Sequence, residues 1–361
     1  MEEYRQDNRV FYILLFFAVI LAGFLCKLLS SVFIPVLFAA MLSFILLPLI
    51  RKINLKLGIP WFMSSIIVVF LSCVLFIGFS SLLIRSLTMI ISEYPKYESK
   101  FMSIYQIIAR NINLEVDETK SFIENMWTHL KVREYVQKTA VFLSTGVFSF
   151  SKNFFLIAFM TTFLLLEMRI MKRKLHYAFS KDKEKASRVA HQIVNETVRY
   201  ISIKFIISLA TGIISFFVTL IAGLDFPVVW GFLAFIMNFI PIFGSIISVG
   251  LTTLFAILQL YPSWGSPVVI FILLTSVNIT LGNIVEPRIE GKNLGLSPFI
   301  ILVCLSLWGY LWGFLGMLIA VPITVIIKII CENIDYLQSI AIIMGNKPKH
   351  SQNLTETNKT N

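Results

Sequence analysis

Charged residues are scarce in this sequence. Only 14% of its 361 residues are Asp, Glu, Lys or Arg, whereas 57% are hydrophobic and the mean hydropathy is +0.83. Soluble domains carry about 25% charged and about 45–50% apolar residues, so a soluble fold of this size could not keep so much apolar surface away from water. A bilayer is itself an apolar solvent. The composition therefore predicts an integral membrane protein, with the lipid bilayer as its first partner.

Residues that hold metals, form disulfides or bind nucleotides are also few. The four cysteines form no C-x-x-C pair, and the four histidines are scattered without metal-ligand spacing. No P-loop, dinucleotide-binding fingerprint or H-E-x-x-H motif occurs, and no nucleophile–base–orienter set is visible. We therefore expect no metal, no cofactor and no enzymatic activity. The net charge of +11 comes from basic loops beside apolar runs, which indicates membrane topology rather than nucleic acid as a partner.

Long apolar runs make up most of the remainder. About 20 apolar residues are needed to cross the hydrocarbon core of a membrane. The first run follows a mixed-charge start and lacks the basic segment of a cleaved signal peptide, so we interpret it as a retained span. The pattern predicts an all-α polytopic membrane protein with about eight transmembrane segments. The runs are 11–29, 32–50, 60–85, 146–168, 205–223, 227–260, 265–286 and 298–331.

Two of these runs, 227–260 and 298–331, are too long for a single span, and each is interrupted. We expect each to form a helical hairpin or a broken helix. Irregular backbone at membrane depth is tolerated only where it is buried in protein or lines a cavity, so both breaks are candidate functional positions. The interrupting residues are Asn238, Pro241 and Gly244 in the first run, and Gly309, Gly313 and Gly316 in the second.

Two stretches between the runs are too polar to be spans. Residues 86–145 nearly balance acidic and basic residues and show helical periodicity, which predicts an amphipathic helical subdomain. Residues 169–204 are strongly basic. The expected organisation is three spans (1–85), the amphipathic insertion (86–145), a fourth span (146–168), a basic helical segment (169–204), a membrane core (205–335) and a polar tail (336–361).

The basic residues also orient the chain. Cytoplasmic loops are enriched in Lys and Arg, and both 51–56 and 169–204 are basic. Three spans precede residue 86, so a cytoplasmic N-terminus places 86–145 outside the cytoplasm, and the fourth span returns the chain. Two later hairpins would keep the C-terminus inside. We expect a multi-pass protein of the bacterial cytoplasmic (inner) membrane with both termini in the cytoplasm.

Polar residues form a stripe along the span 205–223. Helix packing through small residues would explain such a face, and so would the wall of a solute path, because polar groups in hydrocarbon are costly without partners. At about 100° per residue, one face carries Lys204, Ser208, Thr211, Gly212, Ser215 and Thr219.

A second stripe, on 265–286, contains two amides and a carboxylate. It fits either an interhelical hydrogen-bond network capped by an interfacial Glu or a polar site for a substrate or coupling ion. Pro287 cannot donate a backbone hydrogen bond and so frees a carbonyl one turn earlier. Unwound carbonyls beside a carboxylate are common materials of cation and proton sites in transporters. The stripe comprises Thr275, Asn278, Gly282, Asn283 and Glu286.

Three segments of the second half resemble a known family. Residues 238–244 (N-F-I-P-I-F-G) resemble the N-x-I-P-x-x-G element of the autoinducer-2 exporter family of permeases. Residues 286–298 (E-P-R-I-E-G-K followed by L-G-L-S-P) resemble its next element, and residues 308–322 (from W-G to A-V-P) its last. Order and spacing fit over about 200–335, whereas over 1–200 the resemblance is one of topology. In the last element, Gly309, Gly313, Gly316 and Pro322 are expected to pack a hairpin.

The resemblance implies an inner-membrane exporter or permease that forms a homo-oligomer, with a pentamer as one expectation. Relatives in that family are associated with autoinducer-2, with sodium–proton antiport or with sporulation. We expect this chain to export a small polar solute such as an autoinducer-2-like molecule. Non-helical backbone at Asn238, Pro241 and Gly244 would line the path, and side chains would come from residues such as Asn278 and Glu286.

Two other functions stay open. The first is sodium (lithium)/proton antiport through Glu286, helped by Lys204, which the near absence of acidic residues in mid-span weakens. The second is a non-transporting membrane scaffold whose insertion at 86–145 binds a partner.

Overall fold

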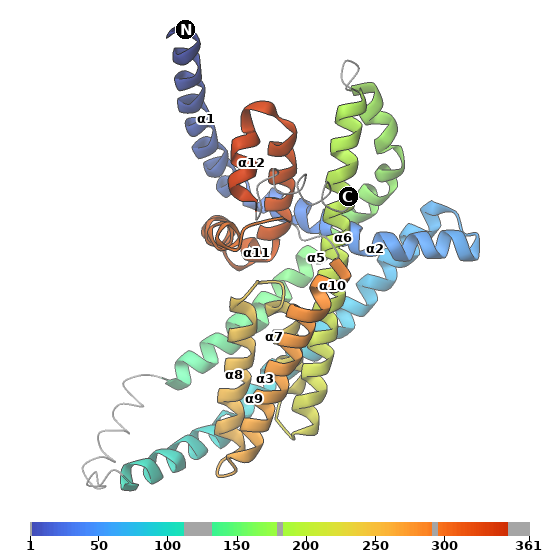
Figure 1. Ribbon diagram of the computed structural model, residues 1–361. Coiled ribbons are helices and arrows are strands. Elements are labelled where there is room, and N and C mark those ends of the chain that lie inside the picture. Colours follow the sequence, from blue (N-terminus) through green and yellow to red (C-terminus); the bar gives the residue numbers. More distant parts are fainter. Residues whose placement is uncertain (1, 112–131, 179–182, 291–294, 346–361) are drawn as a thin grey trace, which may run out of the picture. The chain divides into compact units, whose positions relative to one another are not determined.

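The structure is a computed structural model that describes residues 2–111, 132–178, 183–290 and 295–345 (Figure 1). The described residues are helical almost throughout, and their one extended pairing is an isolated bridge between Leu296 and Gly345. The all-α prediction is therefore confirmed.

The first half of the chain forms very long helices. No proline occurs in α6, and its first glycine is Gly212. Nothing therefore ends the helix before its apolar part. The expected segment limits at 85, 145, 168 and 204 accordingly fall inside continuous helices, and the division into segments stays a prediction. These helices are α1 (Glu2–Leu28), α2 (Ser30–Leu57), α3 (Trp61–Asn111), α5 (Val132–Ala178) and α6 (Lys183–Ile221).

The second half of the chain is made mostly of shorter helices, because glycine and proline occur often in it, and its long helix Pro298–Asn333 is broken at Gly313. It contains α7 (Pro227–Met237), α8 (Phe243–Leu260), α9 (Gly265–Asn278), a π-helix (Ile279–Val285), α10 (Glu286–Glu290), α11 (Pro298–Asn333), a 3-10 turn (Asp335–Leu337) and α12 (Gln338–Met344).

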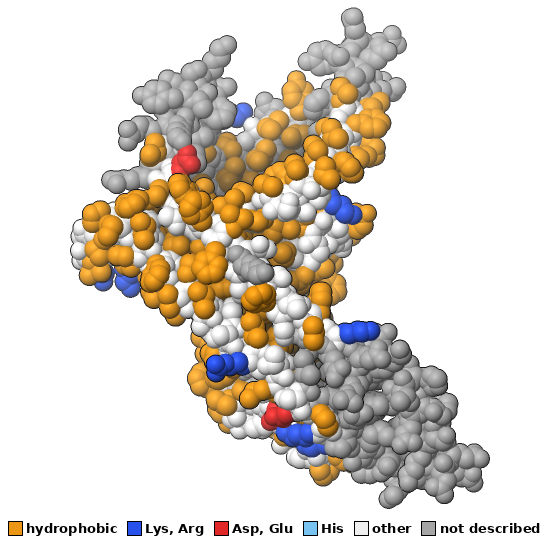
Figure 2. Space-filling view, turned by 180° about the vertical axis from the view of Figure 1, so that it is seen from behind, with side chains coloured by type: hydrophobic (Ala, Val, Ile, Leu, Met, Phe, Trp, Pro, Cys, Tyr) orange, Lys and Arg blue, Asp and Glu red, His pale blue; other side chains and the backbone are white. Residues whose placement is uncertain are grey.

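Seven helices in the described part of the chain are long and apolar enough to cross a membrane. Large apolar side chains stand exposed along them, for example Phe70 at 68%, and apolar side chains cover much of the described surface in Figure 2. Such a surface suits contact with lipid tails. The eighth expected run, 11–29, appears as the shorter apolar helix Phe16–Leu28, and the run 227–260 is divided into the short helix Pro227–Met237 and the span Phe243–Leu260. The seven are Ser30–Leu57, Trp61–Ile90, Ser144–Met168, Ser187–Ile221, Phe243–Leu260, Gly265–Ile289 and Pro298–Asn333.

The chain divides into two compact units, and α3, α5 and α6 contribute residues to both. Unit 1 contains Met1–Ile66, Leu156–Ser202 and Lys292–Asn361, and unit 2 contains Ile67–Phe155 and Ile203–Gly291.

In unit 1, α11 contacts α1, α2 and α12. The break in α11 lies at Gly313, whose φ of +64° and ψ of −145° interrupt the helix. A Cβ at Gly316 would overlap the Trp308 carbonyl oxygen, so the two halves of α11 meet closely. The predicted break in 298–331 is thus confirmed. A core forms around Tyr200, Ile201, Leu296, Val321, Val325, Ile329 and Met344.

Two side-chain contacts fix the break of α11 against the end of α1. The Trp312 indole Nε1 donates to the Cys26 carbonyl at 2.8 Å, and the Lys27 ammonium lies 4.3 Å from the centre of the Tyr310 ring. Pro322 is buried in the second half of the helix, and Gly309 faces the flexible Met317 side chain.

In unit 2, α8 lies against both α7 and α9 (Figure 1). Helices α7 and α8 form the hairpin expected in 227–260, and their turn lies at residues 238–242. Ile242 has a φ of +66°, and a Cβ at Gly244 would overlap the Met237 carbonyl oxygen. Only glycine fits there, which is why the sequence carries it three residues after Pro241. The core of this unit contains Leu224, Val249, Ala256, Ile270 and Leu274.

Candidate transport site

The polar stripe predicted on α6 is a buried face of unit 2. Ser208, Thr211, Ser215 and Thr219 are each at most 2% exposed. Thr211 and Thr219 donate to carbonyls of their own helix, whereas the Ser215 hydroxyl has no hydrogen-bond partner among the described residues. Buried polar atoms nearly always find partners, so the Ser215 hydroxyl is an exception on this face.

Lys204 leads into this face and forms an ion pair with Glu286, the first residue of α10. The Lys204 ammonium lies 2.8 Å and 3.0 Å from the two carboxylate oxygens. The side chains are 9% and 13% exposed, respectively. Water therefore screens the pair little, and neither charge could stay unpaired at low cost. The sequence predicts a role for both residues in antiport, with Lys204 helping Glu286, but it does not predict that they are in direct contact, as they are in the structure.

The tip of the α7–α8 hairpin meets the same face one turn further along α6. The Asn238 amide donates to the Ser208 hydroxyl at 2.9 Å, and Asn238 is 8% exposed. Lys204 and Ser208 are four residues apart and so share a helix face. The hairpin tip and the start of α10 therefore converge on one polar stripe.

A close helix crossing holds the hairpin against α6. A Cβ added at Gly212 would lie 2.8 Å from the Phe235 Cβ and 2.9 Å from the Gly231 carbonyl oxygen. The reciprocal approach exists at Gly231, against Phe216 and Gly212. The small-residue packing that was one interpretation of the stripe is thus present beside the polar contacts, and sequence reasoning missed Gly231.

A π-helix separates the two ends of the second predicted stripe. Asn278 donates to the Leu274 carbonyl of its own helix, Gly282 has open space at its Cβ position, and Asn283 is exposed. A π-helix closes each turn with one more residue than an α-helix, so side chains after it are rotated relative to those before it. Glu286 thereby reaches Lys204 while the two amides face elsewhere. Their role in a solute path stays a prediction, as does that of the exposed Pro287.

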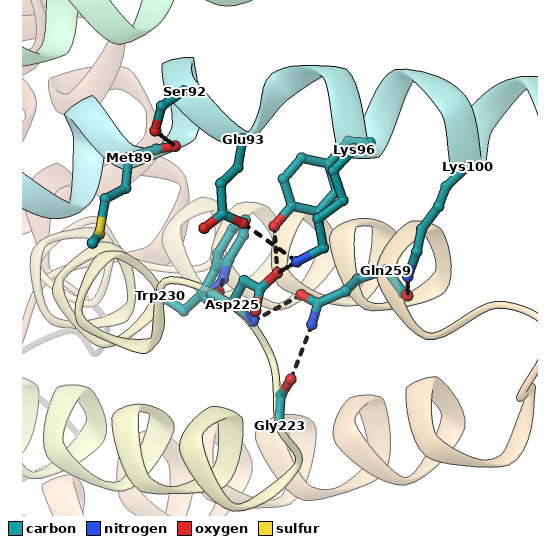
Figure 3. A network of polar contacts seen from close by, with 10 residues as sticks. Met89, Ser92, Glu93, Lys96, Lys100, Gly223, Asp225, Trp230 and Gln259 are labelled. Atoms are coloured by element: carbon teal, nitrogen blue, oxygen red, sulfur yellow. Dashed lines mark hydrogen bonds and ion pairs between the residues drawn. The ribbon is translucent and has the colours of Figure 1, made fainter.

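A polar network at the other end of the hairpin was missed by sequence reasoning (Figure 3). Its centre is Asp225, in the connection between α6 and α7. The Asp225 carboxylate accepts hydrogen bonds from the Tyr97 hydroxyl at 2.5 Å and from the Lys96 ammonium at 2.7 Å. Its backbone N–H donates to the Gln259 side chain at 2.7 Å. One signal was available: Asp225 is the single charged residue between Lys204 and Glu286.

The network shifts the proton affinities of its members. Burial alone would raise the pKa of the Asp225 carboxyl, but the hydrogen bonds from Lys96 and Tyr97, with the nearby charge of Lys100, outweigh it and hold that pKa below its ordinary value. Burial, together with the Asp225 carboxylate, raises the pKa of the Tyr97 hydroxyl. The hydrogen bond to Asp225 raises the pKa of the Lys96 ammonium. Each group is therefore held in the protonation state that the contacts require.

Comparison with known proteins decides the family. The sequence matches the AI-2E family transporter pattern over residues 13–335, which includes the first half of the chain. The chain belongs to the AI-2E transporter family. This confirms the resemblance seen in the second half and extends it to the spans before residue 200. The protein is accordingly a multi-pass membrane transporter.

Named relatives of the chain share most of its length. The AI-2 transport protein TqsA of Escherichia coli K12 is 25% identical over 336 residues, covering 89% of this chain and 91% of that protein. The sodium-lithium/proton antiporter of Halobacillus andaensis is 22% identical over 341 residues, covering 85% and 90%. A protein of Borreliella burgdorferi that is named as a transport protein is 29% identical over 337 residues, covering 93% of this chain and 90% of that protein.

Proposed function

We propose that this AI-2E family transporter exports a small polar solute, such as an autoinducer-2-like molecule, along the buried polar face of α6. One observation carries the proposal: the Lys204–Glu286 pair and the Asn238–Ser208 contact lie one helical turn apart on that face. Both contacts join α6 to segments outside it. A face that only packed helices together would not need a buried ion pair, because a buried pair gains little over apolar side chains.

The chemistry of this face suits a neutral polar solute. The two charges cancel within the pair, so the face offers amide and hydroxyl groups without a net charge. The buried Ser215 hydroxyl has no hydrogen-bond partner among the described residues, and we propose that it donates to the solute when the path opens. The hairpin turn adds backbone groups of the kind that broken helices present in transporters: α7 ends there with carbonyls, and α8 begins there with N–H groups.

The proposal includes a setting in the cell. We place the chain in the bacterial cytoplasmic membrane with both termini in the cytoplasm, supported by the basic segments at 51–56 and 169–204. We also propose a homo-oligomer, in keeping with the family resemblance, with a pentamer as the size to test first.

Sodium/proton exchange is the second candidate, and the Lys204–Glu286 geometry favours it. Both carboxylate oxygens face one cationic group in a poorly hydrated place. In this candidate function a sodium ion takes the place of the ammonium at the Glu286 carboxylate, and its binding is coupled to the release of one proton from the site. One cation bound for one proton released is the exchange that the name of the Halobacillus relative describes.

Flux through proteoliposomes tests both candidates with the same variants. For solute export we expect uptake or release of autoinducer-2 by the wild type, a loss of about tenfold or more in Glu286→Gln, and little dependence on sodium. A tenfold loss corresponds to about 1.4 kcal/mol in the transport barrier. For exchange, the same variant abolishes sodium-driven proton movement instead. Lys56→Gln, at the exposed end of α2, is the matched control. Wild-type-level flux of both solutes in Glu286→Gln would rule out the proposed site.

A further inference from the structure

The network around Asp225 ties together both ends of the α7–α8 hairpin. Asp225 precedes α7, and its backbone carbonyl accepts a hydrogen bond from the Trp230 indole at 2.9 Å. Gln259 lies in the last turn of α8 and is 8% exposed. It accepts from the Asp225 N–H and donates to the Gly223 carbonyl at 2.9 Å. Side-chain contacts therefore join the segment before α7 to the end of α8 at the base of the hairpin.

The same base is fastened to α3 beyond its apolar span, which ends at Ile90. Tyr97, which is 6% exposed, donates to Asp225 and packs against Phe255 with ring centres 5.1 Å apart. The Lys96 ammonium reaches the same carboxylate oxygen, and Lys100 donates to the Gln259 carbonyl. Figure 3 shows Lys96 of α3 reaching toward Asp225, in the connection before α7, and Lys100 reaching toward Gln259 of α8.

The position of the hairpin tip depends on this fastening. Helix α7 has 11 residues, about 16 Å at 1.5 Å per residue, so it transmits the placement of its base to its tip without a flexible section. At the tip, the Asn238 amide makes one hydrogen bond to Ser208. The Gly212–Gly231 crossing holds the middle of α7 against α6, so the fastening at the base and this crossing together set where the tip lies, and the single hydrogen bond at the tip follows from them.

The residues of this network stay in fixed protonation states. Its carboxylate holds its charge below the ordinary pKa of an aspartate, and its tyrosine holds its proton above the ordinary pKa of a phenol. The charged groups facing Asp225 are Lys96 and Lys100 of α3, with Glu93 near Lys96. The charges on which these contacts depend therefore do not change across the physiological pH range.

We propose that Asp225 is a positioning residue for transport, which fixes the base of the α7–α8 hairpin on α3 so that Asn238 meets Ser208. The inference rests on the proposed role of the hairpin tip in the solute path. Asp225 itself does not touch the solute.

Hydrogen–deuterium exchange of the full chain in lipid nanodiscs, without any solute, tests the proposal. In Asp225→Asn we expect exchange of tip peptides covering 238–246 to accelerate about fivefold, the ratio that corresponds to about 1 kcal/mol, with α9 unchanged. Glu93→Gln is the matched control. It removes a carboxylate 3.3 Å from the same lysine but leaves Asp225 in place, and should leave tip exchange as in the wild type.

A pH profile separates positioning from general support. After correction for intrinsic exchange rates, wild-type tip exchange should rise as the pH falls below the ordinary Asp range, and Asp225→Asn should show no such step. Acceleration confined to 222–230, or equal acceleration in α9, overturns the proposal. If Asp225→Asn is not recovered folded, Tyr97→Phe decides by the same criterion, because it removes one hydrogen bond and keeps the ring. Because no solute is present, the outcome does not depend on whether Glu286→Gln alters flux.

Discussion

The Lys204–Glu286 pair makes a prediction that can be worked out from its burial. With side chains 9% and 13% exposed, removal of either partner leaves a charge in a poorly hydrated place. Breaking a buried pair in this way costs about 3–5 kcal/mol, whereas replacing both partners by uncharged groups is often close to neutral. Lys204→Met and Glu286→Gln should each destabilise the protein strongly, and the double variant should be more stable than either single one.

The assay is a double-mutant cycle on purified protein in one detergent. Unfolding is followed by tryptophan fluorescence under conditions where it is reversible, because an interaction free energy is defined only for reversible unfolding. Because each single loss is about 3–5 kcal/mol and the double variant should lose less than either, the expected interaction free energy between the two sites exceeds about 3 kcal/mol, the upper end of the range for contacting residues. Flux should be lost in all three variants, so the double variant is the informative one: stable but inactive.

Additivity would refute this reasoning. If the double variant loses the sum of the two single losses, the two groups do not depend on one another and the contact contributes nothing to the fold. If the double variant recovers both stability and flux, the pair is structural and the solute path lies elsewhere.

Two further predictions concern glycine and pH. Gly244→Ala should prevent the hairpin turn from closing, costing about 3 kcal/mol or more, whereas Gly282→Ala has open space at its Cβ position and should change the melting temperature little. Because folding lowers the pKa of Asp225, the unfolded chain binds its proton more readily, so the contribution of Asp225 is complete above the ordinary Asp pKa and is lost as pH falls through the lower folded pKa. The melting temperature of the wild type should therefore fall on acidification below about pH 4 by more than that of Asp225→Asn, and parallel curves would contradict this.

Periodicity and chain breakers predicted much of this fold. The buried face of α6 follows from the regular 3.6-residue repeat of the helix. In a continuous helix this repeat places Ser208 and Thr211 on the same face as Lys204. The hairpin tip follows from Pro241, between the two helices, and from Gly244 at the start of α8, where a side chain would overlap the Met237 carbonyl oxygen.

What could not be predicted depends on contacts between distant segments or on local departures from the α-helix. The π-helix at Ile279–Val285 changes the direction of the side chains that follow it in α10. No residue type in this segment indicates a turn with an additional residue. The contact of Asp225 with Tyr97 joins residues 128 positions apart, so nothing local encodes it. The one visible sign was the isolation of Asp225 among uncharged residues.

Pro95 provides a point at which α3 can bend, next to the residues that hold the hairpin. It lies inside α3, after the apolar span ends at Ile90 and immediately before Lys96 and Tyr97. Proline cannot donate to the carbonyl four residues earlier, so the helix bends most easily here. Beyond Pro95, Lys96, Tyr97 and Lys100 hydrogen-bond to the base of the hairpin, whereas before it the Phe79 ring lies against Phe232 of α7. A spectroscopic label on the part of α3 beyond Pro95 would therefore report displacements of the hairpin while lying outside the proposed solute path.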